Sequence, residues 1–210
     1  MWRTTPLHRR EVEGSADDDW APELPAGVDA ADVQGADAGV GPLFRRRYRA
    51  TIREADLSPE ALLARVVGDP NRAAPTEFAI FQKVAGAEGP MQVGDEYVVR
   101  MPGPWDGPVR VVDVTERSFR LVTLDGHLEA GTIEFRAAPD PQGVRFEIES
   151  WARSGDHLSN LLYHRLRMAK EIQLHMWTSF LERVAGLAGG RLTGGIDIHT
   201  SRVDGRGDGA

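Results

Sequence analysis

The feature that most constrains the fold is a stripe of apolar residues near the carboxyl end of the chain. The stripe recurs at helical spacing and follows Asp156, a candidate N-cap. It comprises Leu158, Leu162, Leu166, Ala169, Ile172, Met176, Phe180 and Val184, and is widened by Leu161, Trp177 and Leu181. We therefore predict one helix from Asp156 to about Leu187, roughly 45 Å long at 1.5 Å per residue. An apolar face of that length needs a whole sheet to cover it.

The segments before this helix alternate with the period of two that strands show. The predicted strands are 44–52, 78–84, 96–101, 109–115, 119–124, 128–138 and 144–152, and a short helix with Ser58 as its N-cap is predicted at 58–68. Short links rich in glycine and proline separate the last six strands. These strands therefore form an antiparallel meander, because a parallel return needs a crossover of a dozen or more residues. The predicted fold class is α+β: a curved antiparallel sheet of about six to seven strands that grips the long carboxy-terminal helix.

Composition bounds the class of protein. The 210 residues suit one domain, and no run of about 18 apolar residues exists to span a membrane. No apolar run follows the early arginines as in a secretory signal, so we expect a soluble, cytoplasmic protein. The net charge of -7 argues against a nucleic-acid partner, and the absence of cysteine excludes disulfides and thiolate metal sites.

One basic cluster, Arg45 to Arg49, runs against the acidic balance. Alternation places Arg45, Arg47, Arg49 and Arg53 on one face of a strand, opposite Phe44, Tyr48, Ala50 and Ile52. We interpret the arginines as a solvated face rather than a phosphate site.

The two ends of the chain show neither the period of two that strands have nor the helical period of apolar residues. Residues 1–38 are acidic and poor in large apolar side chains, and residues 189–210 are rich in glycine, so we expect both segments to be disordered. The folded domain is then expected to comprise residues 39–188.

The element order resembles the helix-grip fold of the START and Bet v 1-like superfamily, also called SRPBCC or polyketide cyclase-like proteins. Within it, the stretches 39–44, 93–95, 107–112 and above all TLDGHLEAGTIEF at 123–135 resemble DUF1990, an uncharacterised family. This chain has Asp125 where the resemblance leads us to expect proline, and Thr132 where it leads us to expect an acid. The resemblance, which spans 39–185, implies a pocket for a small apolar or lipid-like molecule.

The stretch 123–135 also carries the candidate chemistry. A two-residue turn at Asp125-Gly126 would pair Val122 with Glu129, which places His127 and Glu129 toward the interior as a candidate acid-base pair, with Asp125 as a second carboxylate. That register would expose one strand's core residues. A bulge at Gly131 repairs this conflict. The set Phe119, Leu121, Leu128, Ala130, Ile133, Phe135 and Ala137 then shares the core side, with His127, Glu129 and Glu134 outside it. We favour the bulge.

The remaining candidates are aromatic residues and methionines that could line a cavity beneath the long helix. They are Tyr97, Trp105, Trp151, Tyr163, Met176 and Trp177. We expect no metal site, because His164 lies too far along the helix to share an ion with Glu171 and His175, and we expect no cofactor, because no phosphate or dinucleotide motif occurs. Three functions stay open: a binding module, a hydrolase, cyclase or isomerase that uses His127, and a partner-binding or homodimeric protein.

Overall fold

The computed structural model describes residues 5–102, 106–155 and 162–204; within 162–170 it describes the helical backbone but not the side chains. One sheet forms the body of the protein, in the strand order β1-β9-β2-β8-β7-β6-β5-β4-β3. The strands are β1 (Leu7–Glu13), β2 (Val40–Arg53), β3 (Ile80–Ala85), β4 (Glu96–Arg100), β5 (Asp106–Val114), β6 (Ser118–Thr123), β7 (Glu129–Asp140), β8 (Gly143–Ser154) and β9 (Arg191–Val203). The helices are α1 (Ala16–Asp19), α2 (Pro59–Gly68) and α3 (Leu162–Leu187), with short 3-10 turns η1 (Ala36–Ala38) and η2 (Pro70–Arg72).

The predicted meander is confirmed. The strands from β3 to β8 pair consecutively and antiparallel, and β2 joins the far side of β8. The short helix α2 begins as predicted: the side chain of Ser58 accepts the backbone N–H of Ala61, and Pro59 occupies the first turn. The long helix α3 ends at Leu187 as predicted, whereas the expected cap Asp156 lies outside the described residues.

Two expectations about the sheet and the chain ends are wrong. The described sheet has nine strands rather than six or seven, and it is mixed, because β1 runs parallel to β9. Both extra strands lie in the segments that we expected to be disordered, 1–38 and 189–210. β9 pairs along β2, where the buried Ile198 lies opposite Tyr48. The backbone hydrogen bonds offered by the edge of β2 and the burial of alternate β9 side chains offset the entropy of ordering this segment.

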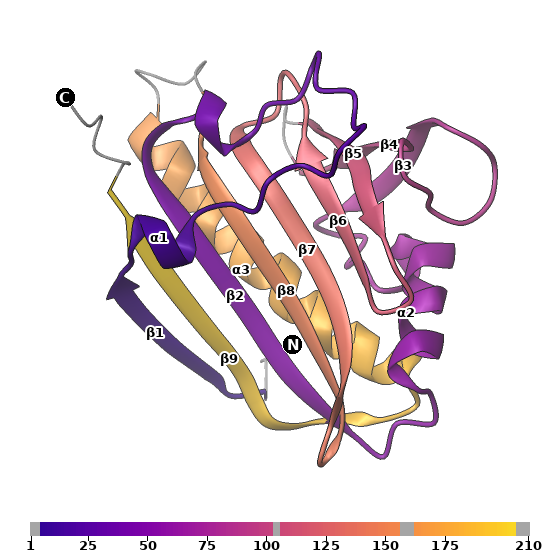
Figure 1. Ribbon diagram of the computed structural model, residues 1–210. Helices are drawn as coiled ribbons and strands as arrows, with labels where there is room; N and C mark the ends of the chain where they lie inside the picture. The colour runs from indigo at the N-terminus through magenta and orange to yellow at the C-terminus, as the bar shows by residue number, and fades with distance from the viewer. Residues whose placement is uncertain (1–4, 103–105, 156–161, 205–210) are drawn as a thin grey trace.

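The helix α3 crosses one face of the sheet, which we call the concave face (Figure 1). The main core lies between them. Toward the carboxyl end of α3 it is filled by large aromatic side chains, whose ring centroids lie 4.5 Å apart for Phe119 and Phe135 and 5.5 Å apart for Phe135 and Trp177. Phe180 and Leu181 of α3 are almost fully buried against the same sheet residues. This end of the sheet and helix is therefore closely packed.

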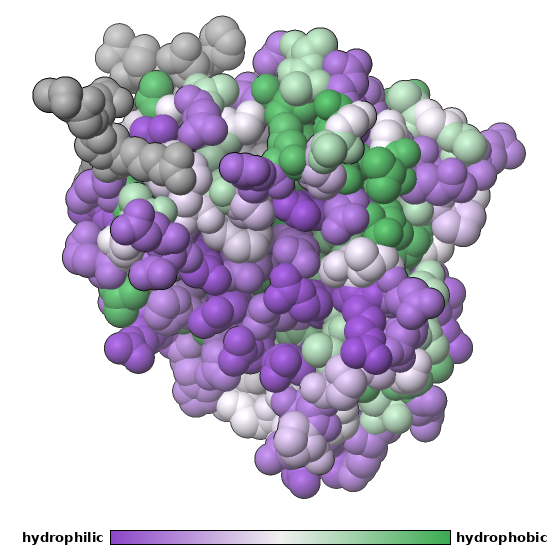
Figure 2. Space-filling view, viewed as in Figure 1, coloured by the Kyte–Doolittle hydropathy of each residue, from purple (hydrophilic) through white to green (hydrophobic). Residues whose placement is uncertain are grey.

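The other face, which we call convex, is crossed by the amino-terminal arm between β1 and β2 (Figure 1). A second, smaller core lies beneath this arm and contains Leu43, Trp151 and Val203. The view of this face in Figure 2 shows mainly hydrophilic side chains over the middle of the sheet. Arg45 pairs there with Glu149 at 2.7 Å, and Arg49 pairs with Glu147 at 2.8 Å. The arginine face predicted as solvated thus forms ion pairs across neighbouring strands.

No helix in the described part of the chain combines the length and apolar character needed to cross a bilayer.

Candidate functional site

The hairpin between β6 and β7 is wider than a two-residue turn would make it. Asp125 and Gly126 do form a turn, in which the N–H of His127 donates to the carbonyl of Leu124 and Gly126 has a φ of 91°. The ladder does not continue from this turn, because Val122 lies opposite Thr132 rather than Glu129. The pairing is shifted by three residues, an odd number, so Phe119 and Leu121 share a face with Phe135 and Ile133.

The arm occupies the space that this shift opens. The backbone N–H of Gln34 donates to the carbonyl of Thr123, and its carbonyl accepts the N–H of Gly131. The side-chain amide of Gln34 donates to the carbonyls of His127 at 2.9 Å and Glu129 at 3.2 Å. Gln34 therefore satisfies backbone groups that a regular hairpin would pair with one another.

The predicted bulge at Gly131 is wrong. The β7–β8 ladder runs without a shift from Glu129, opposite Ser154, to Asp140, opposite Gly143. Gly131 is needed for another reason: a Cβ at this position would lie 2.0 Å from the carbonyl oxygen of Trp151. The two backbones approach too closely there for any side chain.

The unbroken ladder decides which residues face α3. Glu129 alternates with Ile133 and Phe135 and therefore lies on the concave face, against our preferred expectation. Glu134 lies on the convex face as expected, where it pairs with Arg136 at 2.7 Å. Ala130 is buried, but its Cβ lies on the convex side beside Gly39, not with the main core.

His127 is also on the concave side. Its ring packs against Gly107, where an added Cβ would lie 3.0 Å from Nε2, and Gly107 alternates with the core residues Val109 and Val111. The backbone N–H and the carbonyl oxygen of Glu129 both lie 2.9 Å from Nδ1. Either tautomer thus occupies Nδ1 with the backbone of Glu129, and Nε2 remains for another partner.

Burial lowers the pKa of His127 below its usual value of 6.5, and the nearby Glu129 opposes this shift. Loss of hydration disfavours the charged ring more than the carboxylate favours it. The imidazole is therefore mainly neutral at pH 7.

The predicted acid-base pair is not assembled. The carboxylate of Glu129 accepts a hydrogen bond from Nε2 of Gln173 on α3 at 2.6 Å, so it contacts the helix rather than the imidazole. Asp125 is exposed at the tip of the turn, where its backbone N–H donates to the carbonyl of Asp32. Neither carboxylate hydrogen-bonds to His127 in the described structure.

Sequence reasoning missed the charged group closest to Glu129, which is Arg46. Arg46 alternates with Tyr48 and Ala50 and so lies on the concave face of β2. Its side chain is 10% exposed, and its Nη1 lies 3.8 Å from Oε1 of Glu129. The guanidinium stacks over the ring of Phe44 at 4.8 Å. The alternation with Tyr48 and Ala50 already indicated that Arg46 faces inward, but we treated it together with the neighbouring arginines.

The residues of β8 that lie beside Arg46 and Phe44 on the concave face have small side chains. Ser150 lies opposite Arg46, and Ala152 lies opposite both Phe44 and Gly131. One residue pair further along, Tyr48 lies opposite Ile148, which in turn lies opposite Phe135. Large side chains therefore fill one end of the concave face, and small ones surround the charged residues at the other.

Two further side chains close to Arg46 and Glu129 along the strands are polar. Burial raises the pKa of the Tyr48 phenol to about 12, with smaller opposing effects of Arg46 and Glu129, so the phenol is protonated at pH 7. The hydroxyl of Ser154, opposite Glu129, is buried and has no hydrogen-bond partner among the residues that the structure describes. We call Arg46, Tyr48, Glu129, Ser154 and Gln173 the concave polar cluster.

The candidate lining residues divide between the two faces. Tyr97, Met176 and Trp177 belong to the core beneath α3. Trp151 lies on the convex face beneath the arm, so it cannot line a space under α3, because its odd position in β8 points away from Ile148 and Ser150. Trp105 and the side chain of Tyr163 lie outside the described residues.

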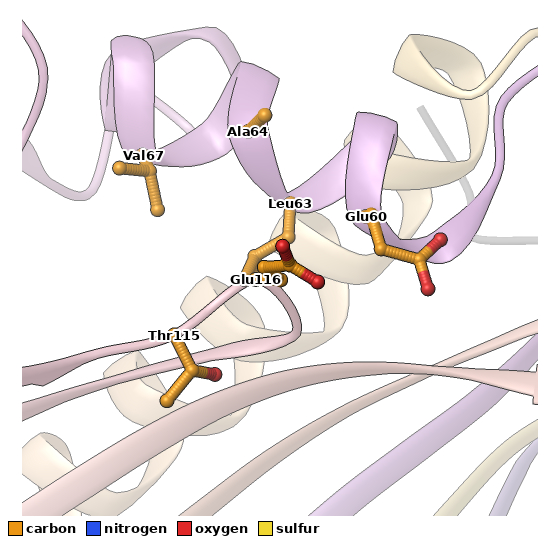
Figure 3. Close-up of a pocket in the computed structure, with 6 residues that line it drawn as sticks. All are labelled: Glu60, Leu63, Ala64, Val67, Thr115 and Glu116. Atoms are coloured by element: carbon orange, nitrogen blue, oxygen red, sulfur yellow. The ribbon is translucent and has the colours of Figure 1, made fainter.

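A separate hollow of about 390 Å³ lies on the surface between α2 and the turn that joins β5 to β6 (Figure 3). Its walls include Leu63 and Val67 of α2 and Thr115 and Glu116 of the turn. It is open to solvent and contains none of the concave polar cluster. As for metal ligands, the described residues contain no group of three or more suitable side chains, and His175 stacks against Phe78 at 6.3 Å.

The chain belongs to the family described as "Domain of unknown function (DUF1990)", whose model matches residues 73–183. The fold is the helix-grip fold expected from the resemblance, although with nine strands in the described sheet. No match was found among curated proteins.

Solved structures with a similar fold share little sequence. The NMR solution structure of KanY protein (ms6282) has a TM-score of 0.50 at 12% identity, covering 68% of this chain and 96% of that chain. The crystal structure of the di-domain ARO/CYC StfQ from the steffimycin biosynthetic pathway has 0.49 at 10% identity, covering 70% and 51%. Ara h 8.0201 has 0.46 at 10%, covering 69% and 97%. At such identities the likeness concerns the fold alone.

Proposed function

We propose that this protein binds a small, mainly apolar molecule between the concave face of the sheet and α3. The observation that carries the proposal is the concave polar cluster: charged and polar side chains on a face that is otherwise apolar. Ligand sites of proteins combine apolar walls with a few placed polar groups in this way. A chain that needed only a packed core would be more stable with apolar residues at these positions.

The site is also reachable. The side chain of Glu129 retains 22% of its exposure, although it lies on the concave face and hydrogen-bonds to α3. On the sheet itself, Ser150 and Ala152 have smaller side chains than Ile148 and Phe135, which occupy the other end of the concave face. Tyr97, Met176 and Trp177 supply apolar and aromatic surface in the core between the concave face and α3.

Binding is a better proposal than catalysis because the acid-base pair is not formed. His127 contacts the backbone of Glu129, and the Glu129 carboxylate is held by Gln173. In the proposed site, Nε2 of the neutral His127 acts as a hydrogen-bond donor or acceptor toward the ligand.

Native mass spectrometry of the protein purified from its own host tests the proposal. We expect a retained small molecule that is lost when the protein is denatured. The control is Trp151→Phe, which changes an aromatic residue on the convex face and should keep the molecule. If the host protein carries nothing and no apolar probe binds, the proposal is wrong.

Association with a second copy of the chain is a separate proposal that rests on the edge strand β3. Ile80 and Val84 of this strand are exposed, at 45% and 51%, and an edge strand has unpaired backbone groups. The same mass spectra report it, since a dimer would appear at twice the mass of the chain. A monomer at high concentration would contradict it.

A further inference from the structure

Arg46 has more hydrogen-bond donors without an acceptor among the described residues than any other member of the concave polar cluster. Its side chain is nine-tenths buried, yet no described residue accepts a hydrogen bond from its guanidinium. A guanidinium has five N–H donors, and the burial of Arg46 leaves them only limited contact with water. A buried arginine is therefore expected to have acceptors close by.

Glu129 does not provide them. Its Oε1 lies 3.8 Å from Nη1 of Arg46, beyond the reach of a hydrogen bond, and its Oε2 is already bound to Gln173 at 2.6 Å. The helix α3 thus draws the carboxylate away from the arginine. The charge of Glu129 partly balances that of Arg46, but the N–H donors have no acceptor in the part of the chain that the structure describes.

The guanidinium is nevertheless held in place. It lies over the ring of Phe44 at 4.8 Å, and Ser150 and Thr200 are its neighbours on the two adjoining strands. Serine and threonine are small enough to leave the edge of the guanidinium free. A fixed planar group with free donors can bind two oxygen atoms of one ligand group side by side, which is the geometry of an arginine with a carboxylate.

We propose that Arg46 binds the carboxylate of an amphipathic ligand whose apolar part lies against the concave face. This assignment rests on the proposed function and specifies the ligand class. One carboxylate suits the site better than a doubly charged phosphate, because a single arginine faces it and Glu129 would repel a second negative charge. The hydroxyl of Ser154, which lies opposite Glu129 in the ladder and has no partner among the described residues, is a second donor toward the same end of the ligand.

Three probes that share one twelve-carbon alkyl group test the assignment: dodecanoic acid, dodecanol and dodecylamine. Each is titrated calorimetrically into the full-length protein. The acid should bind at least tenfold more tightly than the alcohol or the amine. Arg46→Met should remove this preference while the alcohol still binds. Arg46→Lys, which keeps the charge without the planar fork, should retain part of it.

The matched control is Arg47→Met, one residue along β2 and on the convex face, which should bind the acid as the wild type does. Equal affinity for the three probes, or an acid preference that survives Arg46→Met, overturns the assignment and leaves the binding function standing. Failure of all three probes to bind overturns both. Circular dichroism of each variant establishes that it is folded.

Discussion

Gln173 donates a hydrogen bond to Glu129 at 2.6 Å and so joins α3 to the first residue of β7. This contact links the long helix to the hairpin that carries the most distinctive sequence of the family. Because of this contact, the Glu129 carboxylate hydrogen-bonds to neither His127 nor Arg46 in the described structure, although it stays in an ion pair with Arg46 at 3.8 Å.

A double-mutant cycle on this pair should show coupling. Gln173→Ala should lower the free energy of unfolding by about 1 kcal/mol, less than for a fully buried bond to a charged group because Glu129 is partly exposed. Glu129→Ala should lower it by more, because it also removes the counter-charge that lies 3.8 Å from the buried Arg46. The double variant should cost less than the sum of the two, since both remove the same bond. Urea unfolding measures all three, and strict additivity would contradict the contact.

Gly131→Ala should lower the free energy of unfolding by about 1–3 kcal/mol, because the added Cβ would meet the backbone of Trp151. The control is Gly186→Ala, an exposed position near the end of α3 where an added Cβ meets nothing within 4 Å. That variant should stabilise the protein by up to about 1 kcal/mol, since alanine favours the helix. Thermal unfolding compares them, and a neutral Gly131→Ala would argue against the close approach of β7 and β8.

Gln34→Ala should lower the free energy of unfolding by about 1–3 kcal/mol, because it removes the side-chain donor shared by the carbonyls of His127 and Glu129. Gln142→Ala, at an exposed turn, is the matched control and should have little effect. Amide hydrogen exchange provides a second measurement: the N–H of Gly131, bonded to the Gln34 carbonyl, should be protected. Rapid exchange there would mean that the arm does not occupy the hairpin.

Stability should fall with acidification in part through His127. Its pKa is lowered in the folded state, so the unfolded chain takes up a proton first as the pH falls below about 6.5. The stabilising contribution is complete above that pH and is lost as the pH approaches the lower folded-state pKa. His127→Gln should therefore reduce the loss of stability between pH 7.5 and pH 5.

His199 is the control for this pH dependence, because burial and Arg47 lower its pKa as well. His199→Gln should remove only the part of the pH-dependent loss of stability that comes from His199, and the part that comes from His127 should remain. Titration of the His127 ring by NMR gives the pKa directly. A value above 6.5 would reverse the sign of the prediction.

Alternation along the chain was sufficient to predict the meander and both main helices, because each of those elements buries one face of a regular repeat. It was insufficient at the ends. β9 is stabilised by pairing with β2, and β1 by pairing with β9; local composition does not contain these long-range relationships.

The site shows the same division. The sequence showed that a two-residue turn in TLDGHLEAGTIEF would place the apolar residues of the two strands on opposite faces. A shift of the pairing by an odd number of residues does remove this conflict. The number of residues in the shift depends on Gln34, which lies far away in the sequence. The inward position of Arg46 was readable from its spacing to Tyr48. Arginine is so commonly exposed that the structure was needed to draw attention to it.

The most direct test of the account compares the thermal unfolding of the wild type and Arg46→Met, each with and without dodecanoic acid. Without the acid, the variant should be at least as stable as the wild type, because replacing a poorly satisfied buried charge by an apolar side chain is often neutral or stabilising. With the acid, the unfolding temperature of the wild type should rise and that of the variant should not. A variant that is less stable on its own, and that the acid stabilises as much as it does the wild type, would contradict a ligand-binding role for Arg46.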